Sequence, residues 1–326
     1  PYEDRERMAK AGQNVAFRET DLAKYVADYI AAYSATRRPN SVAALKNATD
    51  KFVAWCKTKG IKHVEAVTVQ RCDEWIAHRF SEKGARSTIV TERGFLAPIW
   101  VQAHRHRLIV ENPWEVARVP GKPKEEDLKY WTLEELKKLF EVCEGWVKDF
   151  AVLDANSGLR VSALTGLTWA DIDFGEGRIV VPVHLSKSGK SYTVPFSPTA
   201  EAVLARRWLE CSSKSRGELV FPSQVKRGKI DRGQVWRRLK AAVKRAGIRD
   251  FGHYSHALRH SFAVALVGAD ISMRVIQDLL GHGSMKTTQI YAKVAPSKAK
   301  EAMDRFNIPT ETTPPVEPPS SPGPET

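Results

Sequence analysis

Side chains that can act together on a phosphate ester fall within one stretch of the chain, residues 256–291. His256 and Arg259 are three residues apart, His282 follows a glycine, and Tyr291 comes nine residues after that histidine. On a helix, a spacing of three places two side chains about 60° apart around the axis, so His256 and Arg259 can reach toward one point. A tyrosine that faces such a cluster of basic groups is a candidate nucleophile.

Two apolar stripes and a short third segment predict the helices that position these residues. The second stripe begins after Asp270 or Ser272, either of which can cap a helix, and it ends at Gly281, which suits a left-handed C-cap. The histidine that follows is therefore expected in a turn. Ser284 can cap one more helix, which we expect to carry Tyr291 on a thinly tethered, mobile segment. The stripes are Leu258, Phe262, Ala265 and Leu266, and Val275, Ile276, Leu279 and Leu280.

The order of these motifs resembles the signature of the tyrosine recombinase (phage integrase) family. That signature runs H-x-L-R-H, then L-G-H, then a tyrosine, and the run S-G-L-R-V-S-A-L resembles the family's first-arginine motif. The segment H-L-S-K-S-G-K resembles its β-hairpin lysine, which we assign to Lys187 with Lys190 as the alternative. The resemblance covers residues 132–308 and implies these catalytic residues: Arg160, Lys187, His256, Arg259, His282 and Tyr291.

The resemblance also implies a mechanism. Tyr291 attacks a DNA phosphate and forms a 3′-phosphotyrosyl link, while the two arginines each hold non-bridging oxygens in a bidentate fork. Lys187 protonates the departing 5′ oxygen, His256 shuttles a proton or steadies the phosphate, and His282 hydrogen-bonds a non-bridging oxygen. The covalent link retains the bond energy, so another strand can be joined without ATP.

No metal or other cofactor is expected. The signature run contains no cluster of Asp and Glu, and H-x-x-R-H lacks the glutamate of the zinc-binding motif H-E-x-x-H. The chain departs from the family at one position, because Ala163 stands where R-x-S-E-L usually has a glutamate. Support for the Arg160 side chain from that glutamate is therefore missing.

Composition favours a DNA partner. The chain of 326 residues has a formal net charge of +13, and residues 310–326 hold three glutamates and no basic residue, so the rest is more basic still. No signal peptide or membrane span is apparent, and the four cysteines are scattered without a C-x-x-C pair. We expect a protein of the cytoplasm that binds double-stranded DNA and no membrane.

The fold is expected to be mainly α with a small β-sheet or hairpin, arranged as a two-domain clamp. Residues 1–111 form a helical core-binding domain, 112–128 a linker rich in Pro, Gly and Lys, 129–309 an α+β catalytic domain, and 310–326 a disordered Pro-rich tail. Thr68 and Thr132 predict helix starts, and Pro98 is expected to kink or split a helix. Basic residues of the first domain suit phosphate contacts: Lys46, Lys57, Arg86, Arg93, Arg105 and Arg107.

The resemblance implies assembly as a homo-tetramer on paired sites. Residues 297–306 form a helix-competent apolar stripe that would pass to the neighbouring subunit, and DNA-bending proteins could assist. Two alternatives remain at this stage. A type IB topoisomerase would use similar chemistry without exchanging strands, and a non-catalytic relative would only bind DNA.

Overall fold

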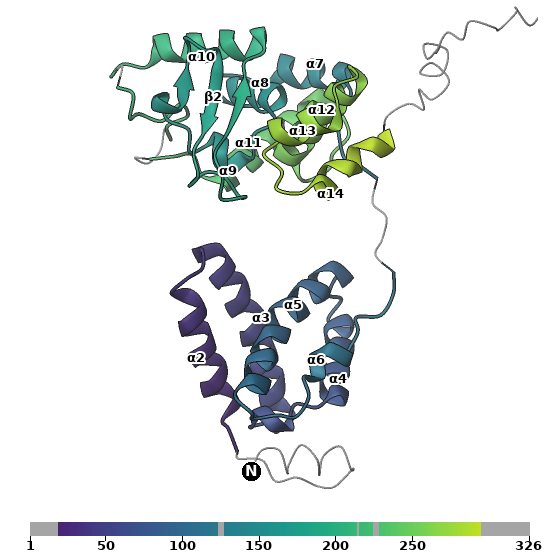
Figure 1. Cartoon of the computed structure of the whole chain (residues 1–326). Helices are drawn as coiled ribbons and strands as arrows, with labels where there is room; N and C mark the ends of the chain where they lie inside the picture. Colours follow the sequence, from purple (N-terminus) through teal and green to yellow (C-terminus); the bar gives the residue numbers. More distant parts are fainter. Residues whose placement is uncertain (1–18, 123–126, 214, 224–227, 295–326) are drawn as a thin grey trace, which may run out of the picture. The chain divides into compact units, whose positions relative to one another are not determined.

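The computed structural model describes residues 19–122, 127–213, 215–223 and 228–294 (Figure 1). The chain divides into two compact units, Pro1–Glu126 and Asp127–Thr326. The expected C-terminal helix at 297–306 and the expected tail at 310–326 lie outside the described residues. Among the helices that are described, none is long and apolar enough to cross a membrane.

Helices build the described part of the first unit. Thr68 caps α4 by accepting a hydrogen bond from the backbone N–H of Arg71, as its position in the sequence predicts. Pro98 lies inside α5 and does not split it. The elements are α2 (Leu22–Ser34), α3 (Pro39–Thr58), the 3₁₀ turn η1 (Val64–Ala66), α4 (Val69–Ser81), α5 (Arg86–Arg105) and α6 (Pro113–Val116).

An aromatic cluster forms the centre of this unit. The ring of Phe52 packs edge-to-face on Trp75, Trp100 and Trp114, with ring centroids 5.4–5.7 Å apart. Trp114 comes from α6 and is 0% exposed. The start of the expected linker, residues 112–128, was therefore wrongly placed, because α6 belongs to the core of the first unit.

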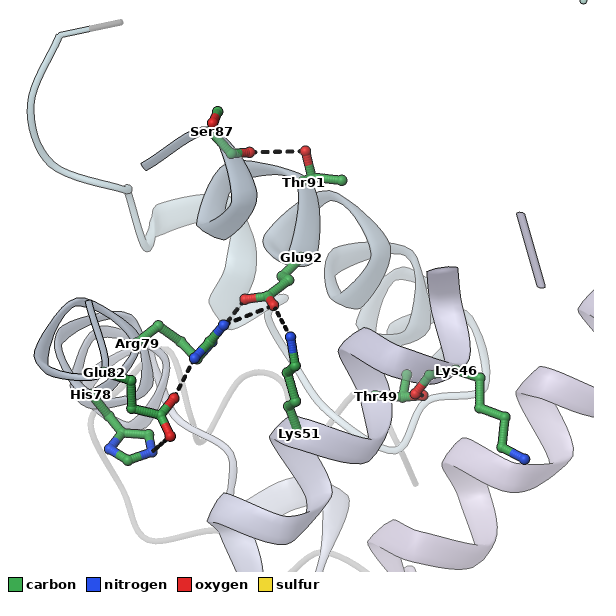
Figure 2. Close-up of polar contacts among 9 residues, drawn as sticks. All are labelled: Lys46, Thr49, Lys51, His78, Arg79, Glu82, Ser87, Thr91 and Glu92. Atoms are coloured by element: carbon green, nitrogen blue, oxygen red, sulfur yellow. Dashed lines mark hydrogen bonds and ion pairs between the residues drawn. The ribbon is translucent and has the colours of Figure 1, made fainter. Parts of the chain in front are cut away.

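A buried ion pair joins three helices of the same unit (Figure 2). The Arg79 guanidinium on α4 donates two hydrogen bonds to the Glu92 carboxylate on α5, at 2.9 and 3.0 Å. Lys51 on α3 donates a third bond to Glu92, at 2.9 Å. Burial raises the pKa of Glu92, but the bonds from Arg79 and Lys51 outweigh it and lower the pKa overall. The carboxylate is thus fully paired, and this fixes the packing of α3, α4 and α5 on one another.

Two of the arginines expected to contact phosphate instead tie the end of the unit to α5. The Arg93 guanidinium donates to the carbonyl oxygens of Ala117 and Trp114, and Arg86 donates to that of Pro120 at 3.0 Å. These bonds engage part of each guanidinium within the fold, and both side chains are half-buried, so phosphate contacts by Arg86 and Arg93 stay a prediction. The exposed lysines at 46 and 57 and the exposed Arg105 remain candidates.

The second unit combines helices with a small antiparallel sheet (Figure 1). The strand order is β1-β2-β3, with Ile172 opposite Ile179 and Ile179 opposite Val194. Thr132 and Glu135 form the predicted capping box at the start of α7. The elements are α7 (Leu133–Val142), α8 (Trp146–Ser157), α9 (Val161–Leu164), η2 (Trp169–Asp171), β1 (Ile172–Asp173), β2 (Arg178–Val181), β3 (Tyr192–Pro195), α10 (Pro198–Glu210), α11 (Arg232–Ala246), α12 (Tyr254–Gly268), α13 (Met273–Leu279), α14 (Met285–Thr288) and η3 (Gln289–Val294).

Helix α8 runs through the core of this unit and carries two buried carboxylates. Asp149 pairs with Arg206 and with Arg207 of α10, the latter at 3.1 Å. Asp154 is 0% exposed and accepts a hydrogen bond from the Ser255 hydroxyl of α12. Burial raises the pKa of Asp154 to about 8, against the opposing effects of Ser255 and the Arg259 charge. Asp154 is thus a neutral acid at neutral pH, and it ties α8 to the helix that bears Arg259.

The raised pKa of Asp154 predicts a specific pH dependence of stability. Below about pH 4 the side chain is protonated in both states, and between about pH 4 and 8 only the unfolded state releases the proton. The stability that the protonated Asp154 side chain contributes is therefore complete at low pH and is lost as the pH rises through about 8. Asn at position 154 stays neutral at every pH. As the pH rises through this window, the free energy of unfolding of Asp154→Asn should therefore increase relative to that of the wild type, by on the order of 1 kcal/mol per pH unit.

Urea unfolding at about pH 5.5 and about pH 8.5 measures this difference. Ser255→Ala is the companion variant, because loss of its hydrogen bond removes support for the ionised form and should extend the loss of stability to higher pH. Parallel pH dependence in the wild type and Asp154→Asn would show that Asp154 ionises normally.

Candidate active site

Arg259 on α12 lies at the centre of the site and is 5% exposed. Its guanidinium donates to the carbonyl oxygen of Gly158, to that of Leu280 at 2.7 Å, and to Nε2 of His282 at 2.8 Å. One side chain thereby joins the segment that precedes Arg160 to the segment that precedes His282. The fork geometry of a guanidinium permits this, whereas a lysine ammonium could not reproduce it.

Arg160 is held beside Arg259 by a tight turn. Gly158 ends α8 in the left-handed conformation, with φ of +59°, and a Cβ there would lie 2.3 Å from the Phe262 ring, so only glycine fits. Two residues later Arg160 begins α9. Burial first, and then the charge of Arg160, lower the pKa of Arg259 to about 10. Two cations that repel each other at close range favour an anion between them.

His282 is neutral, and its tautomer follows from its neighbours. Burial and the charges of Arg259 and Arg160 lower its pKa to about 4. Arginine only donates hydrogen bonds, so Nε2 of His282 must accept from Arg259. The proton is therefore on Nδ1, which donates to the Thr288 hydroxyl at 2.9 Å. The predicted turn is confirmed, because Gly281 has φ of +58° directly after α13.

Tyr291 lies on η3 and its side chain is 1% exposed. The ring packs with Ala263 and Ile276, and the hydroxyl is 2.9 Å from Nδ1 of His260. Burial raises the pKa of Tyr291, while the charges of Arg259 and Arg160 oppose the rise. The phenol is thus neutral and packed in the core, whereas the sequence had suggested that Tyr291 lies on a thinly tethered, mobile segment.

His256 is exposed and lies one turn before His260 on α12. Burial of the ring nitrogens is the largest effect on its pKa, followed by the charge of Arg259, and both lower it. The imidazole can therefore accept a proton at neutral pH. Its exposure leaves it open to a ligand that approaches the two arginines.

The two candidate lysines share one exposed loop. We expected Lys187 at the end of a strand, but β2 ends at Val181, because Pro182 has no N–H to continue the ladder. Lys187 and Lys190 both follow in the loop of residues 182–191. This loop lies against the residue after His282, since a Cβ on Gly283 would be 3.7 Å from that of Ser188.

Three residues of the site were missed by the sequence analysis. His260 contacts Tyr291, Thr288 holds His282, and Tyr192 of β3 lies so close that a Cβ on Gly281 would be 2.5 Å from its ring. Burial raises the pKa of Tyr192, and the charges of Arg259 and Arg160 oppose the rise. The spacing of four between the two histidines of H-x-x-R-H could have indicated His260. No sequence signal pointed to Tyr192.

No group of His, Cys, Asp and Glu among the described residues could hold a metal ion. The charges gathered at the site are instead those of arginines beside neutral imidazoles and neutral phenols. Such a set can bind an anionic ester, stabilise added charge on its oxygens and offer a phenolic oxygen for attack.

Comparison with known sequences identifies the family. The sequence model of the phage integrase family matches residues 129–298. Tyrosine recombinase XerC of Pseudomonas fluorescens strain Pf0-1 is 30% identical over 266 residues, which are 78% of this chain and 85% of that protein. Tyrosine recombinase XerA of Pyrococcus furiosus is 38% identical over 184 residues, which are 55% of this chain and 62% of that protein.

Solved structures have the same fold. The Tn1549 transposon integrase in complex with a circular intermediate DNA superposes with a TM-score of 0.73 at 18% identity, over 89% of this chain and all of that one. A lambda integrase tetramer bound to a Holliday junction gives 0.67 at 20% identity, over 84% and 78% of the two chains. Given the family model and the XerC relative, the chain belongs to the phage integrase family of tyrosine recombinases, enzymes that break and rejoin DNA.

Proposed function

We propose that this recombinase cleaves and rejoins duplex DNA at a specific site, with Tyr291 as the nucleophile. The observation that carries the proposal is the placement of the Tyr291 hydroxyl 2.9 Å from His260, the residue that follows Arg259 on α12, where the charges of Arg259 and Arg160 oppose the rise in its pKa. The alternative, a tyrosine that only packs, does not account for a neighbouring buried guanidinium, Arg259, whose pKa burial and the charge of Arg160 lower. The sequence relatives are recombinases, so a topoisomerase or a non-catalytic relative is not favoured.

The scissile phosphate would bind between Arg160 and Arg259. Its negative charge offsets the repulsion that lowers the pKa of Arg259. As the phosphorus becomes five-coordinate, charge builds on the non-bridging oxygens, and the guanidiniums stabilise that charge more than they stabilise the ground state. The Arg259 contacts to two backbone carbonyls fix its position before DNA arrives, which reduces reorganisation during the reaction.

Cleavage then follows as an in-line displacement. The Tyr291 oxygen forms a bond to phosphorus, the bond from phosphorus to the 5′ oxygen breaks, and Lys187 supplies the proton that the leaving oxygen needs. Lys190 is the alternative donor in the same loop. In the second step a 5′ hydroxyl attacks the phosphotyrosine and gives its proton to the lysine, which cleavage left neutral, and the tyrosine leaves, so the ester energy is conserved.

The two histidines would assist the phosphate. His256 is exposed beside the arginines and would shuttle a proton or steady an oxygen. His282 can donate to a non-bridging oxygen only after Nε2 gains a proton, because that nitrogen now accepts from Arg259. The negative charge of a bound phosphate favours this protonation.

The first unit would act as the DNA-binding domain and the second as the catalytic domain, and together they would clamp the duplex. The lambda integrase tetramer on a Holliday junction supports assembly of four subunits on paired sites. We further propose that residues 297–306 pass to the neighbouring subunit and that accessory DNA-bending proteins assist. We also propose that the protein works in the cytoplasm.

Tyr291→Phe should abolish covalent adduct and leave DNA binding unchanged, because only the nucleophilic oxygen is removed. The substrate is a nicked duplex selected from a randomised pool by covalent capture on the wild-type protein. Denaturing gels measure adduct, and mobility shifts measure binding. Failure of the wild type to capture any duplex, or adduct at the wild-type yield with Tyr291→Phe, would refute the proposal.

Lys187→Ala should lower the rate of adduct formation on ordinary DNA by about 10²–10⁴-fold, which is the usual contribution of a general acid to a reaction rate. A 5′-bridging phosphorothiolate should restore the rate, because a thiolate leaves without a proton. Lys190→Ala is the matched control in the same loop and should react normally on both substrates. Rescue of Lys190→Ala instead would transfer the role to Lys190.

A further inference from the structure

A direct hydrogen bond connects the nucleophile to an imidazole that the mechanism above does not use. The Tyr291 hydroxyl is 2.9 Å from Nδ1 of His260, and the two ring centroids are 5.6 Å apart. His260 lies on α12 directly after Arg259, and that helix is fixed by the buried arginine. The imidazole is therefore positioned by the same element that positions the phosphate-binding guanidinium.

The protonation state of His260 sets the direction of this bond. Burial, and then His256 and the charge of Arg259, lower its pKa to about 4, so the ring is neutral at neutral pH. Tyr291 is protonated, because burial raises its pKa. A neutral imidazole has one acceptor nitrogen, and the phenol O–H donates to Nδ1 when the ring proton is on Nε2.

We propose that His260 is the general base that accepts the proton of Tyr291 as its oxygen attacks the phosphate, a role that rests on the proposed nucleophile. The Tyr291 oxygen bonds to phosphorus, its proton moves to Nδ1 of His260, the bond to the 5′ oxygen breaks, and the leaving oxygen takes a proton from the lysine of the 182–191 loop. In the rejoining step the 5′ oxygen bonds to phosphorus and gives its proton back to the lysine, and the imidazolium returns its proton to Tyr291 as that oxygen leaves.

The proton transfer is coupled to attack and does not precede it. In the free protein a neutral phenol beside an imidazole of low basicity keeps its proton. A phosphate between Arg160 and Arg259 brings a negative charge that raises the basicity of His260. Bond formation to phosphorus makes the phenolic proton more acidic, so transfer becomes favourable only along the reaction. This restricts reactivity of Tyr291 to the DNA complex.

His256 is the competing base, and the geometry favours His260. His256 is exposed, whereas His260 makes the contact to the buried Tyr291 hydroxyl. The two histidines are four residues apart on one face of α12, so both can act in the same site on different groups. His256 then serves the phosphate and the leaving group, and His260 serves the nucleophile.

The test uses His260→Asn, because its amide can keep a hydrogen bond to Tyr291 but cannot take a proton. Adduct formation is measured in single turnover on the 5′-bridging phosphorothiolate, which removes any need for the lysine acid. We expect a rate about 10²–10⁴-fold below that of the wild type at pH 7, with unchanged DNA binding. His260→Ala should behave likewise, and Lys187→Ala should react normally on this substrate.

The pH profile separates a base from a residue that only positions Tyr291. Without a base, attack requires ionised Tyr291, so the rate of His260→Asn should rise about tenfold per pH unit between about pH 6 and 9, while the wild type stays nearly flat. A slow but flat profile would assign only positioning to His260. If His260→Asn reacted at the wild-type rate, His260 would have no role in the reaction. If it reacted faster, the hydrogen bond from Tyr291 to His260 would be a restraint that slows attack. Loss of adduct in the wild type itself would instead refute the proposed function.

Discussion

The buried guanidinium of Arg259 is the interaction on which the site depends. It crosses from α12 to the carbonyl oxygens of Gly158 and Leu280 and to His282, so three separate segments meet at one side chain. An arginine this deeply buried is costly unless its donors are satisfied, and here backbone carbonyls satisfy them. Its own charge then acts on nearby groups, holding the histidines neutral and opposing the rise in the pKa of Tyr291.

Local signals in the sequence predicted much of what surrounds this arginine. Thr132 and Ser272 cap helices where a hydroxyl precedes an apolar stripe, and Gly281 ends α13 in the left-handed conformation. These signals are reliable because the first turn of a helix needs an acceptor and a left-handed residue favours glycine. The order of motifs also predicted that Arg160 and Arg259 act together, and each shifts the pKa of shared neighbours in the structure.

Tertiary contacts that leave no periodic trace could not be predicted in this way. Trp114 lies in a segment rich in proline and glycine, yet it fills the aromatic core of the first unit. The bonds from Arg93 to the carbonyl oxygens of Ala117 and Trp114 likewise left no sign in the sequence. Asp154 is a buried acid whose partner, Ser255, is about a hundred residues away, and such pairs depend on the fold as a whole. Propensity and spacing are local, whereas these contacts are not.

The forked arrangement of the N–H donors of Arg259, and not merely its charge, organises the site. Arg259→Lys retains the charge but cannot bond Gly158, Leu280 and His282 at once. Single-turnover adduct formation by this variant on the selected nicked duplex is the most direct measurement. The account predicts at least about a 100-fold loss of rate with DNA binding nearly unchanged. Adduct formation near the wild-type rate, or an equal loss of binding and cleavage, would contradict it.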